Sequence, residues 1–327
     1  MDDQGRETRA AREGRIRRLT RLFRRIAFSI AIASIALLVT KVIFADRFFA
    51  TKFVFYIPAL LLGPVAIFCA LLSRVGRRVR LLISAAILVF GVIAFHQEQP
   101  VILSPAKVRA ADGAKSISVM SFNVQAYFWG SQRVANAIIA QHPDVVCFVE
   151  GTFAGKAPPQ MVRALGTEYH WVVGKRLSIA SRLPIKDALQ ISATSELHAL
   201  RATIEAPAGE FDVIAVDVKN PTLRNDRSAF DQLYALFQSQ PGSFAALGDF
   251  NAPNGSWQLA RAVEGLQDDL LTAGEGGYQA SWPSPAPLWQ IDHAFSRGLR
   301  AESAETVHVL ASDHFPIVVN YALPAAD

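Results

Sequence analysis

Three long apolar stretches within the first hundred residues constrain the fold of this chain more than any other feature. Residues 26–45 contain a single charged side chain, Lys41, and residues 53–72 contain none. Because an α-helix rises 1.5 Å per residue, about twenty apolar residues cross a hydrocarbon core of roughly 30 Å. Residues 81–95 form a shorter third stretch, which Arg80 can extend by reaching the membrane interface with its charged end. We therefore expect three transmembrane helices within residues 26–96.

The arginines around these stretches predict an orientation. Nine arginines lie in the basic N-terminus, residues 1–25, and four lie in the short loop at residues 73–80. Cytoplasmic segments of membrane proteins carry an excess of Arg and Lys, so both segments are expected in the cytoplasm. Three crossings would then place the rest of this multi-pass cell-membrane protein outside the cytoplasm. If the third stretch is instead a buried or interfacial helix, the rest of the chain lies on the cytoplasmic side.

The charge of the chain changes sign after the apolar region. Up to Asp112 the sequence has 18 Lys and Arg against 7 Asp and Glu, and from Gly113 onward it has 15 against 21. A domain that binds duplex DNA without sequence preference usually has an excess of basic side chains. The acidic C-terminal part therefore disfavours a nucleic-acid substrate, without ruling one out.

Beyond a polar linker at residues 97–115, the pattern changes to short apolar runs separated by turn residues, with a few helical stretches between them. Many strands with few helices predict an α+β fold in which two packed sheets are flanked by helices, over residues 116–327. We expect helices at residues 133–141, 227–240 and 256–263. Strands are expected at residues 116–122, 145–149, 171–173, 178–181, 199–204, 211–218, 244–247, 290–295, 305–311 and 316–321.

Polar side chains stand where several of the expected strands end. A single Asp or an Asp–His pair at such a place is usually only a turn or a solvated loop. Strand ends at one edge of a sandwich converge, however, so a whole set of such residues indicates one functional cleft. The residues of this set are Asn123, Glu150, Asp249, Asn251, Asp292, Asp313 and His314.

The motifs around these residues resemble those of the endonuclease/exonuclease/phosphatase superfamily. In order, they are SFNVQ, FVE, GDFNAP, ID and SDHFPI, within residues 117–321. GDFN and SDHFP are the specific motifs, whereas the Asn and Glu placements alone would be weak. The resemblance implies a four-layered αββα sandwich, preceded here by the three transmembrane α-helices. It also implies cleavage of phosphodiesters or phosphomonoesters with Mg²⁺.

The resemblance assigns a metal site to three residues. Glu150 matches the family's principal metal ligand, and Asn123 and Asp313 match the residues that assist it. Mg²⁺ is a hard ion that takes one or two carboxylates and fills its octahedron with water and phosphate oxygens, so these side chains suit it. Such an ion polarises the phosphoryl group and offsets charge on the leaving oxygen. We therefore expect Mg²⁺ as the cofactor, with Mn²⁺ as an alternative.

The resemblance assigns the reaction itself to four further residues. Asp249 and Asn251 match the pair that positions the attacking water and the phosphate, and a carboxylate can also accept a proton from that water. His314 matches the imidazole that faces the scissile phosphate, and Asp292 matches the carboxylate paired with it. An adjacent anion raises the pKa of a histidine, so we expect His314 to be a charged clamp on the phosphate.

One position departs from the family pattern. Family members usually have a phosphate-binding histidine at the end of the strand before the GDFN segment, where this chain has Asp217. An ionised acid cannot donate a hydrogen bond to phosphate. Two alternatives follow: Asp217 binds a second metal, or Lys219 or Arg224 takes over the phosphate contact.

The remaining aromatic and imidazole side chains give weaker signals. Trp257, just after GDFNAP, is the aromatic residue that we expect to contact substrate, whereas core packing is expected of the other tryptophans. His142, His170, His198 and His308 have no ligand spacing, so each is expected to be structural or exposed.

The sequence thus predicts a membrane-anchored, metal-dependent phosphoesterase. Its substrate would be a phosphate ester of a lipid, a nucleotide or a nucleic acid, and the sequence identifies no protein partner. The alternative from another functional class is a membrane-anchored binding or scaffold protein with a degenerate phosphoesterase domain.

Overall fold

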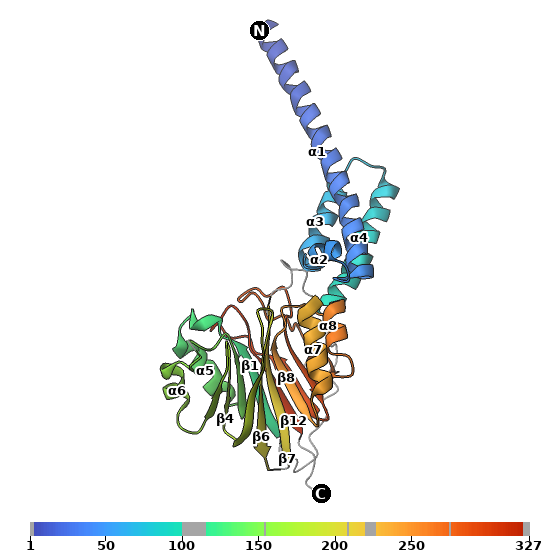
Figure 1. The fold of residues 1–327 in the computed structure, drawn as a ribbon. Helices are drawn as coiled ribbons and strands as arrows, with labels where there is room; N and C mark the ends of the chain where they lie inside the picture. Colours follow the sequence, from blue (N-terminus) through green and yellow to red (C-terminus); the bar gives the residue numbers. More distant parts are fainter. Residues whose placement is uncertain are drawn as a thin grey trace. The chain divides into compact units, whose positions relative to one another are not determined.

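The computed structural model describes residues 3–99, 116–153, 155–207, 209–219, 227–274 and 276–322. The chain divides into two compact units, Met1–Gln97 and Glu98–Asp327 (Figure 1). Most of the expected linker at residues 97–115 lies outside the described residues.

The first unit is helical and consists of α1 (Asp3–Phe44), α2 (Phe49–Phe55), α3 (Ala59–Leu72) and α4 (Arg77–Glu98). Small and branched apolar side chains fill the space between its helices, among them Ala31, Leu38, Ala66, Ala70 and Ile87. Larger apolar side chains such as those of Phe68 and Leu82 point outward and are exposed. Two helical segments, Arg12–Phe44 and Arg77–Glu98, are long and apolar enough to cross a membrane.

The second apolar stretch is not the single helix expected over residues 53–72. Helices α2 and α3 meet at a bend of 78°. Pro58 caps the N-terminus of α3, and a proline disfavours helical geometry for the residue before it, here Ile57. By length and composition, the described helices therefore give two candidate spans, or three if the bent pair is one span.

Lys41, the charged residue within the first apolar stretch, is buried inside this helical unit. Its ammonium group donates a hydrogen bond to the backbone oxygen of Phe55 and lies 4.6 Å from the centre of the Phe55 ring. A carbonyl dipole and a cation–π contact both stabilise a buried positive charge. These contacts explain how Lys41 is accommodated in the interior of the helical unit.

The second unit is built on two six-stranded sheets. In order across the first sheet, the strands are β11 (Arg300–Thr306), β12 (Ile317–Ala322), β1 (Ser116–Asn123), β2 (Val145–Val149), β4 (Leu177–Ser181) and β3 (His170–Val173). Across the second sheet they are β5 (Ile185–Ala193), β6 (Leu197–Ala206), β7 (Gly209–Val218), β8 (Phe244–Asp249), β10 (Asp292–Arg297) and β9 (Gln267–Asp268).

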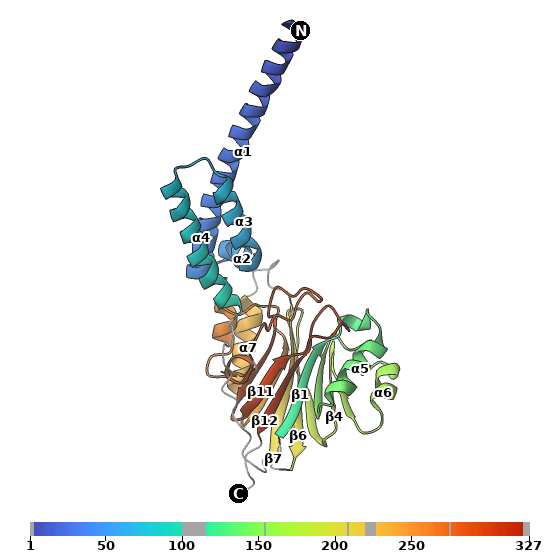
Figure 2. The same ribbon diagram turned by 180° about the vertical axis from the view of Figure 1, so that it is seen from behind.

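Helices cover the outer face of each sheet (Figures 1 and 2). Helices α5 (Ser131–Gln141) and α6 (Pro159–Leu165) pack on the first sheet, and α7 (Arg227–Ser239) and α8 (Trp257–Ala262) pack on the second. The main core lies between the sheets. In β2, Cys147 faces this core, while Phe148 faces the layer under α5. The αββα sandwich is therefore confirmed.

Some elements differ from the expectation. Strand β5 and helices α6 and α9 (Asp269–Ala273) were not expected, because β5 is a largely solvated edge strand and both helices are short. The strand expected at residues 305–311 is wrong, since β11 covers Arg300–Thr306. Its inward positions are the small residues Ala301 and Ala304, which give a weak strand signal.

Candidate active site

A row of polar side chains crosses the ends of four neighbouring strands of the second sheet. The ladder register places His198 of β6 opposite Asp217 of β7, Asp217 opposite Asp249 of β8, and Asp249 opposite Asp292 of β10. Opposite residues in a ladder project to the same face, with strands roughly 5 Å apart. Three carboxylates and one imidazole therefore stand side by side at one edge of the sandwich.

Strand ends of the first sheet meet this row. The side-chain amide of Asn123, at the end of β1, donates to Asp249 Oδ2 at 3.0 Å. Arg176, in the turn before β4, donates from Nη2 to Glu150 Oε1 at 2.6 Å and from Nε to Asp217 Oδ2 at 2.7 Å. These contacts join both sheets at the edge where the sequence motifs end.

His314 and Asp292 form a buried pair. The imidazole Nδ1 lies 2.8 Å from Asp292 Oδ2, and Nε2 lies 3.9 Å from Asp249 Oδ2. Burial favours the neutral ring, but the hydrogen-bonded Asp292, with Asp249 and Asp313, outweighs it and raises the pKa of His314 to about 9. These acidic neighbours therefore favour the protonated ring at neutral pH.

Asp249 is held in one orientation by the GDFN turn. Its Oδ1 accepts the backbone N–H of Asn251 at 2.8 Å, while the Asn251 amide donates to the Val218 carbonyl at 2.8 Å. Burial raises the pKa of Asp249, the charge of His314 acts against this, and Asp292 adds to the rise. In its ionised form, a carboxylate with a raised pKa is a stronger base than an ordinary aspartate.

Several residues at this edge have left-handed backbone geometry although none is glycine. Their φ angles include +55° at Glu150, +65° at Arg176 and +49° at Asn251, and Gln125, Ala126 and Tyr127 just after β1 are left-handed too. This conformation is uncommon for residues with a Cβ atom, and such strained positions cluster at functional sites. Residues with this uncommon backbone conformation thus occur where polar side chains of the two sheets contact each other.

Asp313 and Lys219 lie near this edge but make different contacts. The Asp313 carboxylate accepts from Trp282 Nε1 at 3.3 Å and from Ser312 Oγ at 3.2 Å. Within the described part of the chain, no hydrogen bond or ion pair joins Asp313 to Glu150. Lys219 Nζ lies 3.9 Å from Asp217 Oδ2. Arg224 lies outside the described residues.

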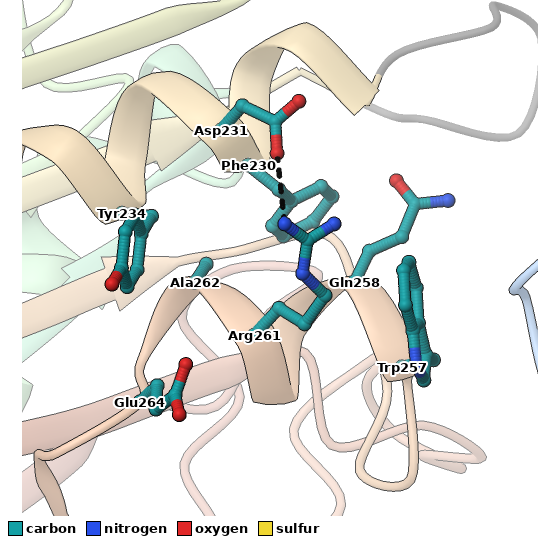
Figure 3. A pocket seen from close by; sticks show the side chains of 8 residues that line it. All are labelled: Phe230, Asp231, Tyr234, Trp257, Gln258, Arg261, Ala262 and Glu264. Atoms are coloured by element: carbon teal, nitrogen blue, oxygen red, sulfur yellow. Dashed lines mark ion pairs between the residues drawn. The ribbon is translucent and has the colours of Figure 1, made fainter.

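Trp257 lines a different hollow, a pocket of about 120 Å³ between α7 and α8 (Figure 3). The guanidinium of Arg261 stacks over its ring at 4.9 Å from the ring centre, and Arg261 also pairs with Asp231 at 3.9 Å. All residues that line this pocket come from the two helices or the segment just after α8. The structure thus places Trp257 in a pocket apart from the strand-end row.

The donor chemistry at the edge suits a hard divalent cation. Glu150 is one-third exposed, and Arg176 contacts only one of its carboxylate oxygens. Asn123 lies opposite Val149, the residue before Glu150, in the parallel pair of β1 and β2. Mg²⁺ needs one or two carboxylates and keeps several waters. In the described ranges no group of three or more His, Cys, Asp or Glu side chains is arranged to hold a metal ion. Glu150 is therefore the carboxylate that this edge offers to such an ion, while Asn123 Oδ1 already accepts from the Gln125 N–H at 3.0 Å.

Two residues of this neighbourhood escaped the sequence interpretation. Arg176 follows Gly174 and Lys175 in a short turn, where nothing in the local sequence distinguishes it from a surface residue. His198 has no motif around it, yet it is buried beside Asp217, and burial lowers its pKa. Neither of its ring nitrogens has a hydrogen-bond partner among the described residues.

Comparison with known proteins agrees with this geometry. Residues 120–314 match the model of the Endonuclease/Exonuclease/phosphatase family. No curated protein matches the sequence. A family protein from Bacteroides thetaiotaomicron has a TM-score of 0.54 and 17% identity over 64% of this chain and 99% of its own.

Two further structures of similar fold were solved with DNA. D. rerio TDP2 complexed with single-strand DNA product has a TM-score of 0.51 and 15% identity, over 63% of this chain and 99% of its own. The 3' phosphatase NExo from Neisseria, bound to a product DNA hairpin, has a TM-score of 0.50 and 18% identity over the same shares. At these identities the likeness concerns the fold. The family match over more than half of the sequence shows that this chain belongs to the endonuclease/exonuclease/phosphatase family.

Proposed function

We propose that this protein is a membrane-anchored phosphoesterase that hydrolyses a phosphomonoester or phosphodiester with a divalent cation, Mg²⁺ or Mn²⁺. The observation that carries the proposal is the buried His314–Asp292 pair, 2.8 Å apart, with the imidazole 3.9 Å from the buried Asp249. A positive donor and a proton-accepting carboxylate that lie this close can act together on one phosphate and its attacking water.

Each residue has a task in this scheme. Protonated His314 donates to a non-bridging phosphate oxygen, and Asp292 keeps the proton on the ring. Asp249 orients the attacking water and accepts its proton. Its carboxylate is held in place for this task, because Asn123 and the backbone N–H of Asn251 each donate to one of its oxygens. Preorganised groups of this kind need little rearrangement as charge develops on the phosphate.

Glu150 and Asn123 would hold the cation, and Asp313 stays our proposed third ligand. When bound, the cation supplies positive charge to a phosphoryl oxygen and to the leaving group. The hydrogen bonds of Asp313 to Trp282 and Ser312 would orient its carboxylate, as outer partners commonly do for metal ligands.

The substrate class is proposed from charge and from the helical unit. The acidic domain and the long apolar helices favour a lipid or headgroup phosphate over a nucleic acid. The fold neighbours solved with DNA, TDP2 and NExo, keep a nuclease or a DNA phosphatase as the alternative. We further propose that the helices anchor the domain as a multi-pass protein with its phosphoesterase unit outside the cytoplasm.

Turnover by the full chain in detergent tests the enzyme hypothesis. Bis(p-nitrophenyl) phosphate and p-nitrophenyl phosphate would be assayed with Mg²⁺, with Mn²⁺ and with EDTA. We expect EDTA to abolish activity, and His314→Ala, Asp249→Asn and Glu150→Gln each to lower kcat by about 10²- to 10⁴-fold. Lys186→Ala, which breaks only an exposed ion pair with Glu210, is the matched control.

Two results would refute or redirect this proposal. Activity that persists in EDTA, or that survives both His314→Ala and Glu150→Gln, would contradict the mechanism. Binding of phosphate without turnover would instead favour the membrane-anchored binding or scaffold protein. Parallel assays with phospholipid vesicles and with plasmid DNA at several salt concentrations would separate a lipid substrate from a nucleic acid, because only the latter should show strong salt dependence.

A further inference from the structure

Arg176 is the cationic side chain that connects the two acidic ends of the site. Its Nη2 lies 2.6 Å from Glu150 Oε1 and its Nε lies 2.7 Å from Asp217 Oδ2. The side chain of Asp217 is 2% exposed, whereas that of Arg176 is 33% exposed. The buried carboxylate of Asp217 therefore fixes the guanidinium, while part of the Arg176 side chain is exposed to solvent.

The backbone of Arg176 is also held in a defined position. Its φ of +65° is left-handed, and it sits in the turn between β3 and β4. The turn is tied to the second sheet, because the backbone N–H of Lys175 donates to the Gln190 side chain at 2.7 Å. The Arg176 carbonyl in turn accepts from Gly151, next to Glu150, at 3.1 Å. Backbone and side chain are thus both held.

The guanidinium keeps donors for a ligand. Nε and Nη2 are used by the two carboxylates, and Nη1 has no acceptor among the described residues. Arginine presents its N–H groups in a planar fork that matches two oxygens of a phosphate. Asp217 neighbours Asp249 in the ladder, so the acid that holds this fork stands one strand, roughly 5 Å, from the proton-accepting carboxylate.

We propose that Arg176 binds a non-bridging oxygen of the substrate phosphate, and that Asp217 acts as a positioning residue that holds the guanidinium in place. The family's usual phosphate-binding histidine is then replaced in this chain by a pair, an acid on β7 and an arginine brought by the β3–β4 turn. Asp217 is neither a substrate contact nor a metal ligand. The inference rests on the proposed function for the identity of its substrate, a phosphate ester.

Binding of inorganic phosphate to the full chain in detergent tests this inference without turnover. Titration calorimetry would be carried out in EDTA and again with Mg²⁺. We expect Arg176→Ala to raise the Kd for phosphate about ten- to hundredfold, as for loss of a charged hydrogen bond. Arg176→Lys should recover only part of the affinity, since an ammonium lacks the fork. Arg300→Ala, an exposed arginine paired with Glu302 at 3.1 Å, is the matched control.

A double-mutant cycle tests the role of Asp217. Asp217→Asn should weaken phosphate binding about three- to tenfold in the wild-type background, and by less than about twofold when added to Arg176→Ala, since it acts through the arginine. In the chromogenic ester assay, the same variant should raise KM more than it lowers kcat. An effect of equal size in both backgrounds would overturn the positioning role.

The possible outcomes separate this inference from the proposed function. If Arg176→Ala and Arg176→Lys, folded by circular dichroism, bind phosphate as tightly as wild type, the inference is wrong even if the enzyme turns over normally. If wild type binds phosphate through Arg176 but hydrolyses neither ester, the phosphate site stands and the hydrolase fails.

Discussion

The Asp292→Asn substitution probes the electrostatics of the site most directly. In the wild-type domain the Asp292 carboxylate lies 2.8 Å from the His314 ring, and both side chains are almost fully buried. Burial lowers the pKa of His314, and Asp292 is the main group that raises it. With Asp292 neutralised, the effect of burial is no longer outweighed. The pKa of His314 should therefore fall from about 9 to its ordinary 6.5 or below.

The size of the effect follows from the pKa. A histidine whose folded pKa is raised stabilises the fold fully below the unfolded value, 6.5, and this stabilisation is lost as pH rises through about 9. The difference corresponds to about 3 kcal/mol at 1.36 kcal/mol per pKa unit. Relief of the buried Asp292 charge offsets part of the loss, so about 3 kcal/mol is an upper bound for the variant.

NMR of ¹⁵N-labelled histidine in the full chain, kept in EDTA, measures this pKa without turnover. The His314 resonance would be assigned by its loss in His314→Gln, and both proteins titrated from pH 5 to 10. The alkaline limb of kcat against pH should move down with the same pKa. A wild-type His314 that titrates near 6.5, or one whose titration is unchanged by Asp292→Asn, would refute the reasoning.

Three further predictions concern the stability of the sandwich, each measured by denaturant unfolding of the full chain. Burial raises the pKa of Asp269 from 3.8 to about 6, so the stabilisation from its protonated form is lost as pH rises through 6. The free energy of unfolding of Asp269→Asn should therefore rise by up to about 3 kcal/mol relative to that of wild type between pH 4 and 7. A difference between the two proteins that does not change with pH would contradict this. His198→Leu removes a buried ring with no hydrogen-bond partner in the described chain and should stabilise by about 1 kcal/mol, whereas a clear loss would show that the ring is satisfied. A Cβ at Gly248 would lie 1.9 Å from the Val216 carbonyl oxygen, so Gly248→Ala should cost at least about 3 kcal/mol. Gly242→Ala, with open space around it, should cost only about 1–2 kcal/mol for its positive φ, and equal losses would disprove the clash.

The fold was predictable where burial is complete. Strand β2, Val145–Val149, is apolar on both faces because it lies between two layers of core, and a continuous apolar run of this length is a strong strand signal. Strand β5 was missed, since its exposed residues Lys186 and Asp187 are adjacent rather than alternating and no residue of this edge strand is fully buried. The break before Pro58 was also missed, because hydropathy counts apolar residues without regard to backbone geometry.

The candidate site shows the same division. The motifs predicted which strand ends have acids, amides and imidazole, and the His314–Asp292 pairing was implied by the family resemblance. Nothing in the sequence predicted that Arg176 would reach both Glu150 and Asp217, which are 26 residues before it and 41 residues after it. Such a contact depends on how a turn of one sheet meets a strand end of the other.

The sequence by itself determined the apolar helices, the sandwich and the chemical inventory of the site, because hydropathy, periodicity and motif are properties of short segments. Only the tertiary structure decided the register that aligns His198, Asp217, Asp249 and Asp292 in one row. A shift of one residue in any of these ladders would turn the side chains to the opposite face. Register is fixed by packing across the whole core, and a local pattern does not contain it.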